Sequence, residues 1–139
     1  MMKYVVTLMA LLLTPISTTH VAMNHQYAMV FFFESTCHYC HLFAPKMQQL
    51  TQDTQLPTYA FSIDNKGMPG FDIPIPVTPE IGQKFFQANN GKAVLPATFL
   101  MNVNSQKFTR ISVGDIPYSQ LSQSVINALN DPKVREALQ

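Results

Sequence analysis

The sequence is poor in charge, and neither sign dominates the charge that is present. Its 139 residues contain nine Lys or Arg and eight Asp or Glu, and the basic residues form no run or stripe. Because clustered basic side chains supply most of the affinity for nucleic acids, we expect no nucleic-acid partner. Internal repeats and low-complexity segments are also absent, and 47% of the residues are hydrophobic. The sequence therefore predicts one domain with a substantial apolar core.

The chain also lacks a hydrophobic run long enough to cross a membrane, which takes roughly 20 apolar residues. Its N-terminal run covers residues 4–13, follows a short basic start that ends in Lys3, and precedes small polar residues. That order is typical of a secretory signal peptide. We therefore expect residues 1–22 to be a signal peptide, either cleaved or retained as an anchor, and residues 23–139 to form a single exported domain.

Only two cysteines, Cys37 and Cys40, are present, and they allow a single intramolecular pairing. A bridge across so small a loop restricts the unfolded chain little, so it would stabilise the fold only slightly. A structural disulfide in an exported chain would be more useful between distant segments. The close spacing therefore favours redox chemistry over a structural role.

Hydrophobic patterning predicts alternating strands and helices. The continuous apolar run at 27–33 indicates a central strand covered on both faces, because it is rich in strand-forming residues and too short for a buried helix. A helix should follow over residues 37–52, with Leu42, Met47 and Leu50 on its buried stripe. Further elements are expected as strands at 58–63, 97–103 and 108–113, as helices at 79–90 and 115–130, and as a last helical turn or a frayed tail at 133–139.

The predicted order is β-α-β-α-β-β-α, an α/β fold in which one four-stranded mixed sheet is flanked by helices. A Pro-rich insertion near residues 65–78 should be extended, because proline fixes φ and biases the preceding residue away from helix. This insertion serves either as a loop over the sheet edge or as an apolar lip that holds partly folded substrate.

The cysteine pair falls where the first predicted strand becomes the first predicted helix. Unpaired N–H groups and the positive end of the helix dipole would then point at the Cys37 sulfur. Both lower the pKa of the Cys37 thiol, which makes Cys37 the candidate nucleophile. His38, when protonated, would add a second stabilising charge. Cys40, one turn later and more buried, could attack a mixed disulfide and release the product.

Residues 32–45, with Pro45 five residues after the second cysteine, resemble the active-site segment of thioredoxin-like proteins. Residues 94–99 are similar to the cis-proline loop of the same family. The resemblance implies a thioredoxin fold in which Leu95–Pro96 is a cis bond packed against the disulfide. It also implies that the Leu95 backbone is free to pair with an extended substrate, so that Leu95 and Pro96 bind substrate.

Within that family, the chain resembles the thiol–disulfide isomerases of F-type conjugative transfer systems. The resemblance rests on Ser35-Thr36-Cys37, on Tyr39-Cys40-His41, on the helix start at 77–80 and on residues 96–104. It implies a periplasmic protein that assists assembly of the pilus or transfer apparatus. Its partners would be disulfide-containing exported proteins and an upstream thiol donor or acceptor, with no cofactor and no metal.

Two further expectations follow from this resemblance. Tyr39 is similar to the residue found at that place in disulfide isomerases, which favours isomerase or reductase activity over a disulfide-forming oxidase. Dimeric isomerases carry a separate dimerisation domain, for which this chain has no room, so we expect a monomer.

One part of the thioredoxin pattern is missing. Thioredoxins usually bury an acid six residues before the first cysteine and pair it with a lysine on the next strand. Phe31 and Ala60 occupy those two places here. Deprotonation of the second cysteine would therefore need Glu34, His41 or water.

The cysteine motif also permits other functions. Cys37-His38-Tyr39-Cys40-His41 matches the c-type haem attachment pattern, and a methionine could be the second axial ligand. Small c-type cytochromes are mainly helical, whereas four strands are predicted here, so a haem electron carrier is the second hypothesis. Zinc held by Cys37, Cys40 and His41 would lack a second close Cys/His pair. In a third hypothesis the chain is a non-catalytic assembly module with an inert cysteine pair.

Overall fold

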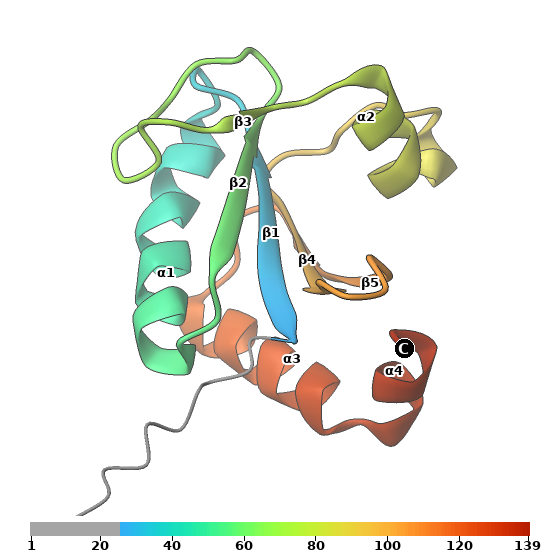
Figure 1. Ribbon diagram of the computed structural model, residues 1–139. Coiled ribbons are helices and arrows are strands. Elements are labelled where there is room, and N and C mark those ends of the chain that lie inside the picture. Colours follow the sequence, from blue (N-terminus) through green and yellow to red (C-terminus); the bar gives the residue numbers. More distant parts are fainter. Residues whose placement is uncertain (1–25) are drawn as a thin grey trace, which may run out of the picture.

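The computed structural model describes residues 26–139, and the predicted signal peptide at residues 1–22 lies outside them. In chain order the elements are β1 (Tyr27–Phe33), α1 (His38–Thr54), β2 (Thr58–Ser62), β3 (Ile75–Pro76), α2 (Pro79–Phe85), the short 3-10 helix η1 (Gln87–Asn89), β4 (Ala97–Asn102), β5 (Phe108–Val113), α3 (Tyr118–Asn130) and α4 (Pro132–Ala137). Helices α1 and α2 lie on opposite sides of the sheet (Figure 1). No helix within the described residues is long and apolar enough to cross a membrane.

The strands form one mixed sheet in the order β3-β2-β1-β4-β5. Strand β1 runs parallel to β2 and antiparallel to β4, while β5 returns antiparallel to β4. The predicted α/β arrangement with a parallel β-α-β unit and a terminal hairpin is confirmed. The predicted count of four strands is wrong, because a fifth strand lies at one edge.

That fifth strand, β3, comes from the Pro-rich stretch and is only two residues long. It runs parallel to β2, with Ile75 beside Phe61 and Pro76 beside Ser62. Proline has no N–H to donate to a sheet, so it is tolerated at an edge such as this one. A two-residue strand that contains proline has no alternating pattern, which is why the sequence did not reveal it.

Strand β1 is buried on both faces, as its apolar run predicts. Met29, Phe31 and Phe33 point into the core beneath α1 and α3, whereas Val30 and Phe32 point into the core beneath α2. We call these two sides of the sheet the α1 face and the α2 face. The alternation follows from the two-residue period of a strand.

Helix α1 covers the α1 face and ends at Thr54, close to the predicted end. The prediction that Leu42 belongs to its buried stripe is wrong, because 46% of that residue is exposed. The buried positions instead follow alternating spacings of three and four residues, along Cys40, Phe43, Met47 and Leu50. The buried stripe therefore includes the second cysteine.

Helix α3 begins at Tyr118 rather than at the predicted Asp115. Pro117 stands at its N-cap with an extended backbone. Because proline disfavours helical geometry in the residue before it, Asp115 and Ile116 stay in the loop that leaves β5. These two loop residues contact α1, as described below.

Candidate active site

Cys37 and Cys40 form a disulfide at the start of α1, with their Cα atoms 5.2 Å apart. Cys37 is the N-cap of the helix, and its backbone is extended. The two sulfurs differ in access, because Cys37 is half-buried whereas Cys40 is fully buried. A substrate can therefore reach Cys37 more readily than Cys40, as the proposed division of roles requires.

The first turn of α1 directs a backbone N–H at the Cys37 sulfur. The backbone N–H of Cys40 donates to Cys37 Sγ over 3.2 Å. No acidic residue lies in that turn to oppose the helix dipole. This arrangement would lower the pKa of the Cys37 thiol in the reduced protein, because the N–H groups of a helix start stabilise a thiolate.

His38 and Tyr39 separate the two cysteines and are both exposed. Tyr39 is 61% exposed, and its ring meets that of His38 edge-on at a centroid distance of 5.5 Å. Both rings are therefore available to an approaching polypeptide. Their modulating effect on Cys37 stays a prediction.

Asp64 fixes the turn that leads into Cys37, and the sequence did not point to it. Its carboxylate accepts hydrogen bonds from the Ser35 N–H at 3.2 Å and from the Ser35 hydroxyl. The Ser62 hydroxyl lies 2.8 Å from the same carboxylate. The Ser35 hydroxyl, assisted by Ser62 and by backbone N–H groups, holds the pKa of Asp64 well below its ordinary value of 3.8. A signal was present, because the carboxyl ends of parallel strands β1 and β2 meet at one edge of the sheet.

His41 holds the same turn at a different atom of Ser35. Its Nε2 lies 2.6 Å from the Ser35 carbonyl oxygen. Since a carbonyl only accepts, His41 must donate from Nε2. Ser35, two residues before the candidate nucleophile, is thus bonded at its N–H, its hydroxyl and its carbonyl.

The buried acid–lysine pair of thioredoxins has no counterpart in this core. Phe31 and Ala60 occupy the positions of that acid and that lysine in the sequence. They lie directly beside each other in the β1–β2 register. Both residues belong to the apolar core that contains Cys40. Glu34 instead lies at the rim, where it lines a hollow of about 440 Å³ together with Ile63, Val77, Lys92, Ala93 and Leu95.

The predicted cis bond between Leu95 and Pro96 is confirmed. Pro96 is buried, and Leu95 and Cys37 pack against the same apolar core as Cys40. Among residues 26–139, neither the N–H nor the carbonyl of Leu95 is hydrogen-bonded to another backbone group. Pairing of these groups with an extended polypeptide, which the resemblance implies, stays a prediction.

No three His, Cys, Asp or Glu side chains converge as a metal site in the part of the chain that the structure describes. The arrangement at the start of α1 is suited to thiol–disulfide exchange. It combines an accessible sulfur at a helix start with a buried partner sulfur and a backbone segment that can hold a peptide.

Comparison with known proteins places this site in a family. Residues 18–126 match the family described as "TraF: F plasmid transfer operon protein". Protein TrbB of Escherichia coli strain K12 is 36% identical over 77 residues, which is 55% of this chain and 41% of TrbB. The aligned stretch therefore spans less than half the length of that relative.

Solved structures with similar architecture have low sequence identity. StoA from Bacillus subtilis matches with a TM-score of 0.52 and 16% identity, over 73% of this chain and 83% of that one. A thiol:disulfide interchange protein of the thioredoxin family from Chlorobium tepidum matches with a TM-score of 0.55 and 18% identity, over 83% and 81%. The predicted thioredoxin fold is thereby confirmed.

Proposed function

Since the chain belongs to the family described as TraF, F plasmid transfer operon protein, we propose that it is a thiol–disulfide oxidoreductase acting on exported proteins. Cys37 is the catalytic nucleophile and Cys40 is the resolving thiol. One observation carries the proposal: the half-buried cysteine of the pair caps a helix whose first turn also holds its fully buried partner. That geometry favours ionisation of one thiol and protects the other.

In the reducing direction, the Cys37 thiolate attacks one sulfur of a substrate disulfide. A mixed disulfide forms, and the other substrate sulfur leaves as a thiolate that takes up a proton. Cys40 then loses a proton and attacks Cys37 Sγ. The substrate leaves with both thiols reduced, and the protein is left with the Cys37–Cys40 disulfide, so two electrons have passed to the substrate. In isomerisation, a different thiolate of the substrate attacks the substrate sulfur of the mixed disulfide. A new disulfide forms within the substrate, the bond to Cys37 breaks, and Cys37 leaves as a thiolate with no net transfer of electrons.

The finer description of this activity is also a proposal. Isomerase or reductase activity is preferred, supported by the exposed Tyr39 between the cysteines. A disulfide-forming oxidase would run the same steps in reverse. The reduction potential of the Cys37–Cys40 pair, measured against glutathione, distinguishes the two, because a strong oxidant has a potential well above that of a reductase.

The proposed place of action is the periplasm, with residues 1–22 as the export signal and the chain as a monomer. The proposed role is assistance in assembling the conjugative pilus or transfer apparatus, supported by the family description. Disulfide-containing exported proteins are the proposed substrates, with a separate thiol protein renewing the active redox state.

The haem-carrier hypothesis has less support from the site. Attachment of a c-type haem needs two free thiols and an imidazole nitrogen directed at iron. Here the two sulfurs bond to each other, and Nε2 of His41 donates to the Ser35 carbonyl. The thioredoxin-like architecture likewise favours exchange chemistry over electron carriage.

Substrate trapping tests the proposal. The Cys40→Ser variant should accumulate covalent adducts on Cys37 with exported proteins, visible as bands on non-reducing gels that disappear on reduction. The matched controls are Cys37→Ser and the double variant, which should form none. A folded Cys40→Ser protein that forms no adduct, even with scrambled ribonuclease A added as a defined substrate, would contradict the proposed nucleophile.

A further inference from the structure

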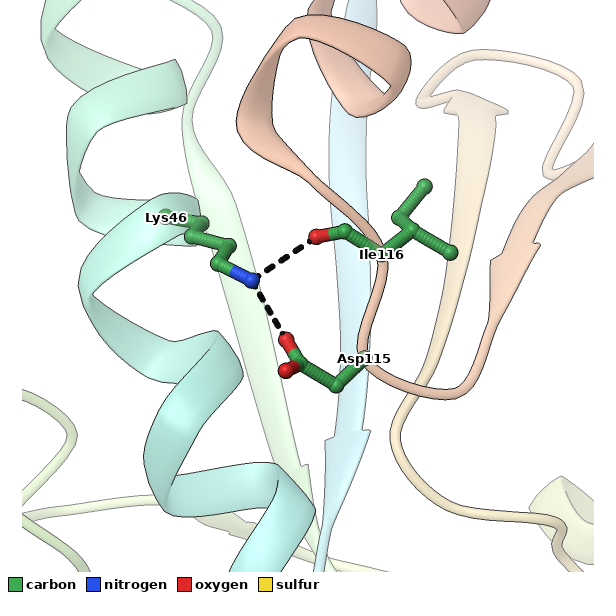
Figure 2. Close-up of polar contacts among 3 residues, drawn as sticks. All are labelled: Lys46, Asp115 and Ile116. Carbon is green, nitrogen blue, oxygen red and sulfur yellow. Dashed lines mark hydrogen bonds and ion pairs between the residues drawn. The ribbon is translucent and has the colours of Figure 1, made fainter.

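Lys46 links the disulfide helix to a distant loop. It lies on α1, six residues after Cys40, and its Nζ is 2.6 Å from Oδ1 of Asp115 and 2.9 Å from the carbonyl oxygen of Ile116. Figure 2 shows the lysine reaching from α1 to both groups of the loop that follows β5. Lys46 and Asp115 form the one ion pair within residues 26–139. Both side chains are largely shielded from solvent, with 27% of Lys46 and 20% of Asp115 exposed.

The same loop also holds the cis-proline segment. The N–H of Gly114, one residue before Asp115, donates to the Pro96 carbonyl over 2.7 Å. The neighbouring residues Ala97 and Val113 are paired in the sheet. Gly114 has a φ of 83°, a conformation that L side chains rarely adopt, so glycine allows the sharp turn from β5 into the loop. Residues 114–116 therefore contact Pro96 on one side and Lys46 on the other.

This connection spans the two halves of the candidate site. Cys37 and Cys40 are carried by α1, whereas Leu95 and Pro96 are carried by the segment before β4. Cys37, Leu95 and Ile116 all pack against the same apolar core. A polypeptide held by the Leu95 backbone must present its sulfur in line with Cys37 Sγ, so the relative position of the two halves decides how often attack succeeds.

From these contacts we propose that Lys46 is a positioning residue, which sets the Leu95–Pro96 loop against the disulfide helix through Asp115, Ile116 and Gly114. This inference rests on the proposed function. Lys46 touches no reacting atom. Its effect is therefore limited to substrates that must bind the Leu95–Pro96 loop while they react with Cys37. Loss of the lysine should impair exchange with a polypeptide disulfide and spare the intrinsic reactivity of Cys37.

The expected size of the effect follows from the demands of orientation. A mutation far from the reacting atoms that misplaces them by about 1 Å can cost on the order of 100-fold in rate, and a loosened loop should cost less, about tenfold in kcat/KM. If the ion pair were purely structural, its loss would lower the free energy of unfolding. The value of kcat/KM for the molecules that stay folded would be unchanged.

The test compares two reactions in the same variants. Isomerisation of scrambled ribonuclease A reports on polypeptide exchange, and alkylation of reduced Cys37 by iodoacetamide reports on the thiol alone. We expect Lys46→Met to lower kcat/KM for ribonuclease about tenfold while alkylation stays within about twofold. Lys46→Arg, which can donate to the same two oxygens, should restore most of the loss. Lys84→Met, an exposed helical lysine on α2, serves as the matched control and should match the wild type in both reactions.

Two outcomes overturn the inference while leaving the proposed function intact. In one, Lys46→Met isomerises ribonuclease as fast as wild type. In the other, alkylation falls as much as isomerisation does, which would place the effect on the thiol itself. Should Lys46→Met not fold, Lys46→Gln replaces it, because glutamine removes the charge and is too short to reach both oxygens in the same way, and the same two outcomes apply. If wild-type protein exchanges no disulfide at all, the proposed function fails, and this inference fails with it.

Discussion

The two faces of the sheet bury apolar clusters of different size, and the candidate site belongs to the larger one. On the α1 face, two helices and the chain end bury a large cluster that contains Cys40, Phe43 and Leu121. On the α2 face, one short helix and η1 cover a smaller cluster built mainly from phenylalanine rings, around Phe32 and Phe99. Hollows of about 470 and 320 Å³ border Phe85, and the larger one reaches Ile111 and Ile116 at the edge of the sheet. A further hollow of about 420 Å³ lies beside α4.

This difference indicates which elements of the fold are held most firmly in their relative positions. Close packing leaves side chains few alternative positions, so elements held by it keep their relative placement. The α1 face sets the disulfide helix against the loop that holds Pro96, whereas the α2 face meets the candidate site through Leu95, which also packs against that core. The predictions below test the contrast between the faces, beginning with the largest expected effect.

Phe43→Ala should be the most damaging of these substitutions. Phe43 is fully buried on α1, one turn after Cys40, with its ring 5.8 Å from that of Phe31. Removing such a ring from a close-packed core costs about 3–5 kcal/mol, because the cavity cannot collapse. Urea unfolding of the oxidised protein measures the change, and a loss below about 1 kcal/mol would contradict the close packing of the α1 face.

Phe85→Ala should cost less, although Phe85 stacks on Phe108 at a centroid distance of 4.1 Å. Phe85 is only partly buried and already borders two hollows. We expect the free energy of unfolding to fall by about 2 kcal/mol. The loss is smaller than for Phe43 because Phe85 buries less apolar surface on folding and its neighbours have room to move into the cavity. Activity per folded molecule should be unchanged. A loss equal to that of Phe43→Ala would remove the contrast between the faces.

Asp64→Asn should reduce the dependence of the free energy of unfolding on pH in the acid range. Because the pKa of Asp64 is lower in the folded protein than its ordinary 3.8, the carboxylate stabilises the fold above that value and the contribution fades as the pH falls below it. Unfolding free energies at pH 6 and pH 3 should therefore differ more in wild type than in Asp64→Asn. Asp72→Asn, an exposed carboxyl in the Pro-rich stretch, is the matched control and should behave as wild type. If the free energy of unfolding fell equally between pH 6 and pH 3 in wild type and in both variants, the Ser35 turn would not depend on the Asp64 charge.

Leu42→Gln should have the smallest effect, within about 0.5 kcal/mol of wild type, because it changes an exposed side chain. Leu42 precedes Phe43 on the same helix, so the pair of substitutions compares the outer and inner sides of α1 directly. Equal losses at the two positions would show that the burial pattern of α1 is wrong.

The sequence predicted those parts of the molecule that depend on neighbouring residues. The apolar run of β1, the helix start at Cys37 and the resemblance around Pro96 each lie within a short segment. The missed contacts join residues far apart in the chain, as between Ser35 and Asp64 or between Lys46 and Asp115. No periodicity records such a pair, since only the folded sheet brings the carboxyl ends of its strands together.

Other misses have different physical causes. The hydrophobicity of Leu42 predicts burial, but Cys40 and Phe43 occupy the buried side of the helix and leave Leu42 on the outer side. Strand β3 is too short to produce a pattern and contains Pro76. Helix α3 begins three residues later than the sequence pattern predicts, because Pro117 disfavours helical geometry in the residue before it.

The most direct test of the account is the pH dependence of Cys37 alkylation in the reduced Cys40→Ser protein, where Cys37 is the only thiol. The account predicts a midpoint clearly below that of a free cysteine, about 8.5, and a return to that value when urea unfolds the helix. A midpoint at or above about 8.5 in the folded protein would contradict the claim that the start of α1 activates this sulfur.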